Sequence, residues 1–275
     1  MPIRSRIYPK SIGDVCVTTF MFLIIPVIYY FELWIVLPTF HTPWCSTYIF
    51  HFTMGNFILF NLSGNLINII LTDTSIKGRI LPAEINKNWR FCTVCEAFAP
   101  PRSWHCPTCN ECILKRDHHC LFTSCCIGHY NHRYFLVFVF YIFIATLYSS
   151  MFNIQFILDR FETVTWLSIV KLVFPLAILF LEWSLAQFYV ALIIIVTLGC
   201  LFTGTLLWYH GLLIAKGLVT HERKEKLSVY DRGYIENIKV VLGTRWYLVW
   251  ISPFIRSELP CDGVEWITNV SVKGK

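Results

Sequence analysis

The stretch from Arg116 to Cys126, RDHHCLFTSCC, places an aspartate, two histidines and three cysteines within eleven positions. Cysteine and histidine are the usual ligands of structural zinc, and a cysteine thiolate beside a histidine is also a strong nucleophile. A thiol nucleophile, its base and a carboxylate that orients the base could be supplied here by Cys120, His118 and Asp117. The same types would equally suit two zinc ligands and the carboxylate behind one of them. The stretch therefore predicts a metal cage, a catalytic nucleophile or both.

The residues in and before this stretch strengthen the case for metal. Eight of the twelve cysteines fall between positions 92 and 126, several with Cys-x-x-Cys spacing and with histidines among them, which favours zinc over disulfides. Two zinc ions need eight ligands, and the region offers more donors than that: Cys92, Cys95, His105, Cys106, Cys109, Cys112, His118, His119, Cys120, Cys125 and Cys126.

The order of these donors suggests that the two sites are interleaved. Because His105 and Cys106 are adjacent, we expect them to face different ions, with the pairs Cys92/Cys95 and Cys106/Cys109 each anchoring one site. Spacing alone allows several partitions. It also leaves open a purely structural zinc module with spare cysteines.

The composition of the chain is that of a membrane protein. Its 275 residues are 56% hydrophobic and 15% charged, with a mean hydropathy of +0.56, whereas soluble domains carry about a quarter charged residues. The net charge of +6 suits contact with anionic lipid or phosphate groups. We expect no nucleic-acid partner, because the sequence has no basic stripe.

Four apolar runs are long enough to span a bilayer: Val15 to Leu37, Tyr48 to Leu71, Tyr134 to Leu158 and Trp183 to Ala215. The run 163–181 contains Lys171 and Pro175, and an even number of spans keeps the basic segments on one side of the membrane. We therefore read it as a lumenal or interfacial segment. The predicted fold class is an α-helical polytopic membrane protein with four transmembrane helices and a cytosolic, zinc-binding, cysteine-rich domain between helices two and three.

The predicted organisation has five parts. These are a cytosolic N-terminus (1–14), transmembrane helices 1 and 2 (15–72), the cytosolic cysteine-rich domain with two zinc sites (73–133), transmembrane helices 3 and 4 with a lumenal or interfacial segment at about 159–182 (134–215), and a cytosolic tail (216–275).

The cysteine-rich stretch resembles the DHHC-type protein S-acyltransferases, or palmitoyltransferases. The matching positions are Cys92-x-x-Cys95, Pro100-Pro101-Arg102-Ser103, His105-Cys106-x-x-Cys109-x-x-Cys112, Asp117-His118-His119-Cys120, Cys126, Gly128, Asn131 and Phe135. Two elements of the tail also resemble the family: Thr220 and Glu222, then Asp231, Gly233 and Asn237. The resemblance covers nearly the whole chain.

The resemblance implies which of these residues bind zinc and which are catalytic. One zinc ion would be held by Cys92, Cys95, His105 and Cys112, and the other by Cys106, Cys109, His119 and Cys126. Cys120 would be the acylated nucleophile, His118 its base and Asp117 the orienting carboxylate.

The implied reaction moves a long-chain acyl group from acyl-CoA through Cys120 to a juxtamembrane cysteine of a membrane-associated protein. The acyl chain would lie among the four helices. The CoA phosphates would contact Lys115, Arg116 or Arg133, for which a lipid-headgroup role is the open alternative. We expect an integral protein of the endoplasmic reticulum or Golgi membrane with a cytosolic active site. The sequence leaves open whether an accessory subunit takes part.

Several positions depart from the family pattern. Leu121-Phe122 replaces Pro-Trp, Cys125 replaces asparagine, Trp104 replaces histidine and Val219 replaces threonine. No nucleophile, base or ligand is lost. Two alternatives remain: a catalytically weak relative that recruits proteins through its zinc loop, and a membrane-anchored ubiquitin ligase, which would leave Cys120 without a role.

Overall fold

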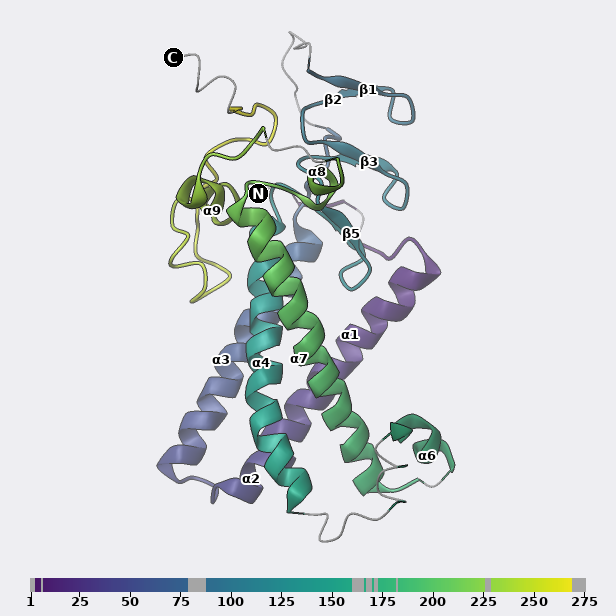
Figure 1. Ribbon diagram of the computed structural model, residues 1–275, viewed down its shortest axis with the longest axis vertical. Helices are drawn as coiled ribbons and strands as arrows, with labels where there is room; N and C mark the ends of the chain where they lie inside the picture. The colour runs from purple at the N-terminus through teal and green to yellow at the C-terminus, as the bar shows by residue number, and fades with distance from the viewer. Residues whose placement is uncertain are drawn as a thin grey trace. The chain divides into compact units, whose positions relative to one another are not determined.

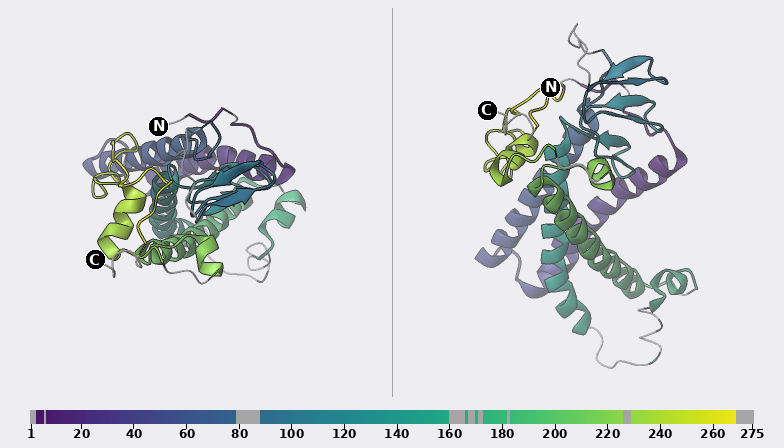
Figure 2. Two further views of the ribbon diagram at one scale, coloured as in Figure 1. Left: turned by 90° about the horizontal axis from the view of Figure 1, so that it is seen from above. Right: turned by 45° about the horizontal axis from the view of Figure 1, so that its top comes forward.

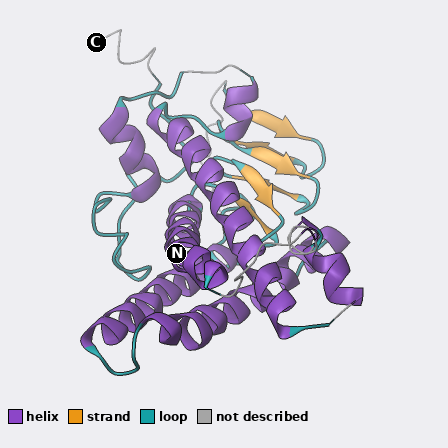
Figure 3. Ribbon diagram, turned by 60° about the horizontal axis from the view of Figure 1, so that its bottom comes forward, coloured by secondary structure: helices purple, strands orange, loops and turns teal. Residues whose placement is uncertain are grey.

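The computed structural model describes residues 3–5, 7–78, 88–159, 166, 170, 173–181, 183–225 and 229–268. Long helices dominate this part of the chain, and its strands form three short hairpins (Figure 3). The chain divides into two compact units, which we describe separately. The first contains Met1–Met21, Asn61–Phe138 and Trp208–Lys275, and the second contains Phe22–Phe60 and Val139–Leu207.

Four helical stretches of the described chain are long and apolar enough to cross a membrane: Ile12–Phe40, Ser46–Leu71, His132–Leu158 and Leu185–Ala215. The first is composed of α1 (Ile12–Tyr30), the π-helix η1 (Phe31–Val36) and α2 (Leu37–Phe40). The other three are α3 (Ser46–Leu71), α4 (His132–Leu158) and α7 (Leu185–Ala215) (Figure 1). With the cysteine-rich region between the second and third stretches, they confirm the predicted fold class.

The segment 163–181, expected to be lumenal or interfacial, contains the short helix α6 (Pro175–Leu181). Phe180 and Leu181 of this helix are exposed. Residues 163–165, 167–169, 171 and 172 of the segment lie outside the described residues, so the lumenal or interfacial placement stays a prediction.

The second unit is held together by aromatic and branched side chains of the spans. Phe31 and Phe156 meet edge to face with ring centroids 5.8 Å apart, and Val36, Leu192 and Ile193 are buried around them. Burying a polar group requires a hydrogen-bond partner, and the Glu32 carboxyl accepts one from the Asn153 side-chain amide at 2.8 Å.

The cysteine-rich region of the first unit is built from three antiparallel hairpins, stacked in chain order (Figures 1 and 2). They pair β1 (Arg90–Cys92) with β2 (Ala97–Ala99), β3 (Trp104–Cys106) with β4 (Glu111–Ile113), and β5 (His118–Cys120) with β6 (Cys125–Ile127). Two-stranded hairpins are at best marginally stable in water. Strands of three residues therefore need a further constraint, such as bound metal.

Each hairpin turns in the same way. Its connecting loop ends in a residue with left-handed backbone: Glu96 at φ 50°, Asn110 at φ 54° and Ser124 at φ 50°. In the middle hairpin, the backbone N–H of Cys109 also points at the Cys106 sulfur, at 3.4 Å. The repeated turn lets both members of a cysteine pair reach the same side of the loop.

The tail packs back on the cysteine-rich region within the first unit. The short helix α8 (Thr220–Lys224) lies beside the hairpins (Figures 1 and 2), and the His221 and Trp104 rings are 4.2 Å apart. Beyond it, α9 (Tyr234–Leu242) presents Asn237, whose amide donates to the Ala215 carbonyl at 3.0 Å. This bond ties α9 to the end of the fourth span.

Candidate metal centre and active site

The first group of candidate metal ligands joins the first and second hairpins. Its four ligand atoms lie within 4.8 Å of one another and belong to Cys92, Cys95, His105 and Cys112. His105 and Cys112 are directly opposite in the β3–β4 register, and His105 Nδ1 is 3.2 Å from the Cys95 sulfur. A soft, mainly thiolate donor set of this kind fits zinc.

The second group joins the middle and last hairpins, and its members are Cys106, Cys109, His119 and Cys126. His119 Nδ1 lies 3.7, 3.4 and 3.8 Å from the sulfurs of Cys106, Cys109 and Cys126, and the last two sulfurs are 3.8 Å apart. Tetrahedral zinc with Zn–S bonds of about 2.3 Å and Zn–N bonds of about 2.0 Å separates two sulfurs by about 3.8 Å and a sulfur and a nitrogen by about 3.5 Å. The donor atoms are therefore spaced as zinc requires.

The strands explain why adjacent residues enter different groups. Successive side chains of a strand point to opposite faces, so His105 and Cys106 of β3 diverge, and so do His119 and Cys120 of β5. The eight residues fall into the same two groups that the resemblance implies. Both groups could hold a metal ion.

Cys120 belongs to neither metal-ligand group in the described part of the chain. It ends β5, and only 7% of the residue is exposed. Burial raises the pKa of the Cys120 thiol, but a hydrogen bond and the positive charge of His118 outweigh burial and hold the pKa below its usual range. The Cys120 thiol therefore ionises more readily than an ordinary cysteine thiol.

His118 is held against Asp117 by a short hydrogen bond, with 2.6 Å between His118 Nδ1 and Asp117 Oδ2. Burial lowers the pKa of His118, but the bond to Asp117 and the contact with Cys120 raise it to about 9. Burial raises the pKa of the Asp117 carboxyl. The hydrogen bond to His118 and the charges of the surrounding histidines lower it by more, so this pKa lies far below its usual range. With Nδ1 committed to Asp117, the other ring nitrogen is left for Cys120.

A second histidine, which no sequence motif singled out, lies at this site. His210 of α7 places Nδ1 3.5 Å from Asp117 Oδ2, and its ring centroid lies 5.4 Å from that of His118 and 5.0 Å from that of Phe135. It lies within an otherwise uncharged span, where an ionisable side chain is by itself a signal of function.

Asp117, His118 and His210 also form a group of potential metal ligands. Two ligands of one tetrahedral ion are separated by more than 3 Å, as the bond lengths require. Because His118 Nδ1 and Asp117 Oδ2 are only 2.6 Å apart, this group is better described as a hydrogen-bonded cluster.

A sequence profile described as DHHC palmitoyltransferase matches residues 85–227. The chain belongs to the DHHC palmitoyltransferase family.

Named relatives of the family extend the similarity beyond the cysteine-rich region. The chain is 36% identical over 222 residues to the probable palmitoyltransferase ZDHHC24 of Mus musculus, covering 76% of this chain and 75% of that protein. The human protein of the same name is 36% identical over 223 residues, covering 80% and 78%. A probable protein S-acyltransferase 13 of Arabidopsis thaliana is 31% identical over 180 residues, covering 63% and 56%.

In this DHHC family member, a buried ion pair joins the cysteine-rich region to the tail. Arg102 Nε and a terminal nitrogen contact the two Glu222 oxygens at 2.6 and 2.7 Å, and the residues are 4% and 0% exposed. The guanidinium also lies over the rings of Tyr230 and Trp266, with its carbon 4.4 and 4.5 Å from their centroids. Sequence reasoning found Arg102 and Glu222 only as parts of separate motifs, without the contact.

The three basic residues expected to contact CoA phosphates differ in exposure. Lys115 is 2% exposed, and burial, followed by the charge of Arg102, lowers its pKa to about 7. Arg133 is 5% exposed and donates to the Ser257 carbonyl at 3.2 Å and to the Tyr134 hydroxyl. Arg116 is partly exposed.

Proposed function

We propose that this DHHC family member is a protein S-acyltransferase, which moves a long-chain acyl group, typically palmitoyl, from acyl-CoA to cysteine thiols of membrane-associated proteins. One observation carries the proposal. Cys120 stands outside both metal-ligand groups of the described chain, beside a histidine whose Nδ1 is bonded to Asp117 at 2.6 Å. A nucleophile, a base and an orienting carboxylate are what thioester exchange requires.

In the first step, the Cys120 thiolate attacks the thioester carbonyl carbon of acyl-CoA. The C–S bond to CoA breaks, and the CoA thiolate takes the proton held by His118. In the second step, His118 accepts the proton of a substrate cysteine, whose thiolate attacks the acyl-enzyme. Cys120 leaves as a thiolate, so one thioester replaces another and no external energy source is consumed.

The two zinc ions of this proposal are structural. They would be held by Cys92, Cys95, His105 and Cys112 and by Cys106, Cys109, His119 and Cys126. Bound zinc would fix the three short hairpins, and therefore the strand that carries His118 and Cys120.

Of the three basic residues, we propose Arg116 as the first contact of the CoA phosphates, because it is the partly exposed one. Lys115 and Arg133 are buried and would reach phosphate only after local opening.

We further propose that the N-terminus (1–14), the cysteine-rich domain (73–133) and the tail (216–275) face the cytosol. The basic residues of these segments support this orientation. The endoplasmic reticulum or the Golgi apparatus is the proposed membrane, and fractionation of cells that express the tagged chain tests it.

The test of activity is autoacylation of the purified chain in detergent. Wild type and Cys120→Ser are incubated with long-chain acyl-CoA, and mass spectrometry locates adducts that hydroxylamine removes. We expect a thioester adduct on Cys120 of wild type and none in the variant. Wild type that holds two zinc ions but forms no adduct would contradict the proposal and favour a zinc-loop recruitment protein.

A further inference from the structure

The N-terminus of the first span carries a buried carboxylate. Asp14 lies in the first turn of α1, is 0% exposed, and accepts hydrogen bonds through Oδ2 from the backbone N–H groups of Ser11 and Lys10 at 3.2 and 3.3 Å. The Ser11 hydroxyl in turn accepts the Asp14 N–H at 3.0 Å. This reciprocal pair is a capping box, which begins the helix. The capping box uses only one of the two carboxylate oxygens, Oδ2.

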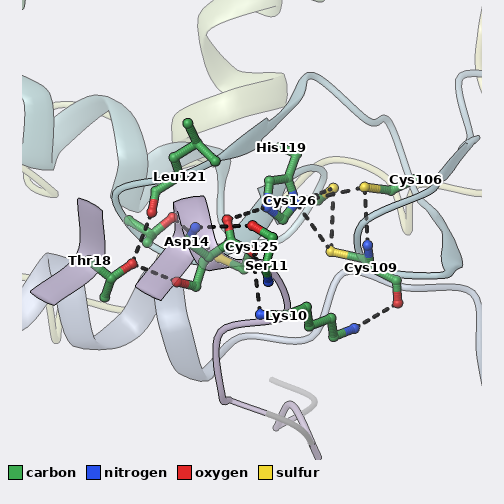
Figure 4. Close-up of polar contacts among 12 residues, drawn as sticks. Lys10, Ser11, Asp14, Thr18, Cys106, Cys109, His119, Leu121, Cys125 and Cys126 are labelled. Atoms are coloured by element: carbon green, nitrogen blue, oxygen red, sulfur yellow. Dashed lines mark hydrogen bonds and ion pairs between the residues drawn. The ribbon is translucent and has the colours of Figure 1, made fainter. Parts of the chain in front are cut away.

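The other oxygen contacts the second metal-ligand group. Asp14 Oδ1 is 3.0 Å from His119 Nε2, while His119 Nδ1 faces the sulfurs of Cys106, Cys109 and Cys126 (Figure 4). The two ring nitrogens therefore serve different partners. A metal-bound imidazole keeps its proton on the free nitrogen, and a carboxylate that accepts a hydrogen bond from this N–H fixes the tautomer and the ring orientation.

Other residues of the N-terminal segment contact the loops around this group. Lys10 Nζ donates to the Cys109 carbonyl at 2.6 Å, beside the turn of the middle hairpin. The Thr18 hydroxyl donates to the Leu121 carbonyl at 2.9 Å, directly after Cys120 (Figure 4). The segment that leads into the first span thus contacts the loops on both sides of His119.

We propose that Asp14 is a positioning residue for this metal centre, acting through His119. It would link the start of the first membrane span to the strand His118–Cys120, so that ordering of the span and ordering of the nucleophile are coupled. The inference rests on the metal assignment in the proposed function, and its readout is metal release, which is independent of acyl transfer.

The competing explanation is that Asp14 only caps α1. Asp14→Asn keeps the size of the side chain and an oxygen that can cap, but removes the charge that faces His119. Ser11→Ala is the matched control, because it removes the hydroxyl that accepts the Asp14 N–H and leaves the Asp14–His119 contact in place.

The experiment measures zinc release from the purified full chain in detergent to a chromogenic chelator. His119→Ala should lose one ion, and the release of its remaining ion identifies the phase that belongs to the other group. We expect Asp14→Asn to release the ion of the His119 group about 10–100-fold faster than wild type, with the other phase unchanged. Ser11→Ala should release both ions at the wild-type rates.

Three outcomes would overturn the inference. Wild-type release of both ions from Asp14→Asn would assign Asp14 to the cap alone. Equal acceleration by Ser11→Ala would do the same. Wild type that holds fewer than two ions would remove the metal assignment and the inference with it. A wild-type chain that holds two zinc ions but forms no acyl adduct would contradict only the proposed activity. The release rates of wild type and the variants would still decide the role of Asp14.

Discussion

Asp117 Oδ1 accepts a hydrogen bond from the backbone N–H of Thr220 at 2.7 Å, although the two residues are 103 positions apart. Its other oxygen, Oδ2, is bonded to His118. The carboxylate is therefore held by the start of α8, and α8 is held by the buried pair of Glu222 and Arg102.

Glu222→Gln should destabilise the folded chain, because it leaves the buried Arg102 guanidinium without a counter-charge. Removing one partner of a buried ion pair costs about 3–5 kcal/mol of the free energy of unfolding. Thermal unfolding in detergent, followed by tryptophan fluorescence, measures the change. Glu236→Gln is the control, since its pair with Lys239 is 40% and 35% exposed and an exposed pair adds little to stability. Equal shifts in the two variants would contradict the structural role of Glu222.

Asp117→Asn should move the acid limb of autoacylation to higher pH. The carboxylate raises the pKa of His118 to about 9, and the resulting positive charge holds the pKa of Cys120 below its usual range. Without the carboxylate, burial lowers the pKa of His118, and the pKa of the Cys120 thiol rises. The fraction of thiolate at neutral pH falls as a result.

Initial rates between about pH 6 and about pH 9 check this prediction, with an expected loss on the order of 10²–10⁴ near neutrality and partial recovery at high pH. A uniform loss at every pH would show that Asp117 acts through folding alone. Zinc content, which should equal that of wild type, serves as the control.

The raised pKa of His118 also determines how the stability of the fold changes with pH. Because the pKa of His118 is raised in the folded state, its interaction with Asp117 stabilises the fold fully below the unfolded pKa near 6.5. This contribution is lost as the pH rises through about 9. The difference in melting temperature between wild type and Asp117→Asn should accordingly shrink at alkaline pH.

Zinc stoichiometry separates ligands from the nucleophile. Cys109→Ala removes a member of the second group and should lose one zinc ion, together with the protease resistance of the hairpins. Cys120→Ser should keep both ions, because Cys120 belongs to neither group in the described chain. Elemental analysis of the two purified variants decides the point, and equal zinc loss would overturn the proposed division of ligands.

Cys125 should stay unacylated although it lies opposite Cys120 in the last hairpin. It is 3% exposed, burial raises the pKa of its thiol to about 12, and its sulfur contacts the Ile69 carbonyl at 3.7 Å. Autoacylation of Cys125→Ser should therefore match wild type, with the adduct on Cys120. A hydroxylamine-sensitive adduct on Cys125 would reveal a second reactive thiol.

The membrane helices could be predicted closely because bilayer thickness sets the length of an apolar run. The second span begins at Ser46 rather than the predicted Tyr48, and the fourth begins at Leu185 rather than Trp183. The first helix begins at Ile12, three residues before the predicted Val15. The capping box of Ser11 and Asp14 explains that turn, since hydrophobicity alone does not report a polar cap.

The sequence by itself determined the donors of the cysteine-rich region, because Cys-x-x-Cys spacing brings two thiols to one turn whatever the surrounding fold. It left their partition open until the family resemblance was considered. Hairpin register places His119 opposite Cys126 and His105 opposite Cys112. Only tertiary structure could place Asp14 on His119 or Thr220 on Asp117, because residues more than a hundred positions apart meet through packing of whole elements and leave no local pattern.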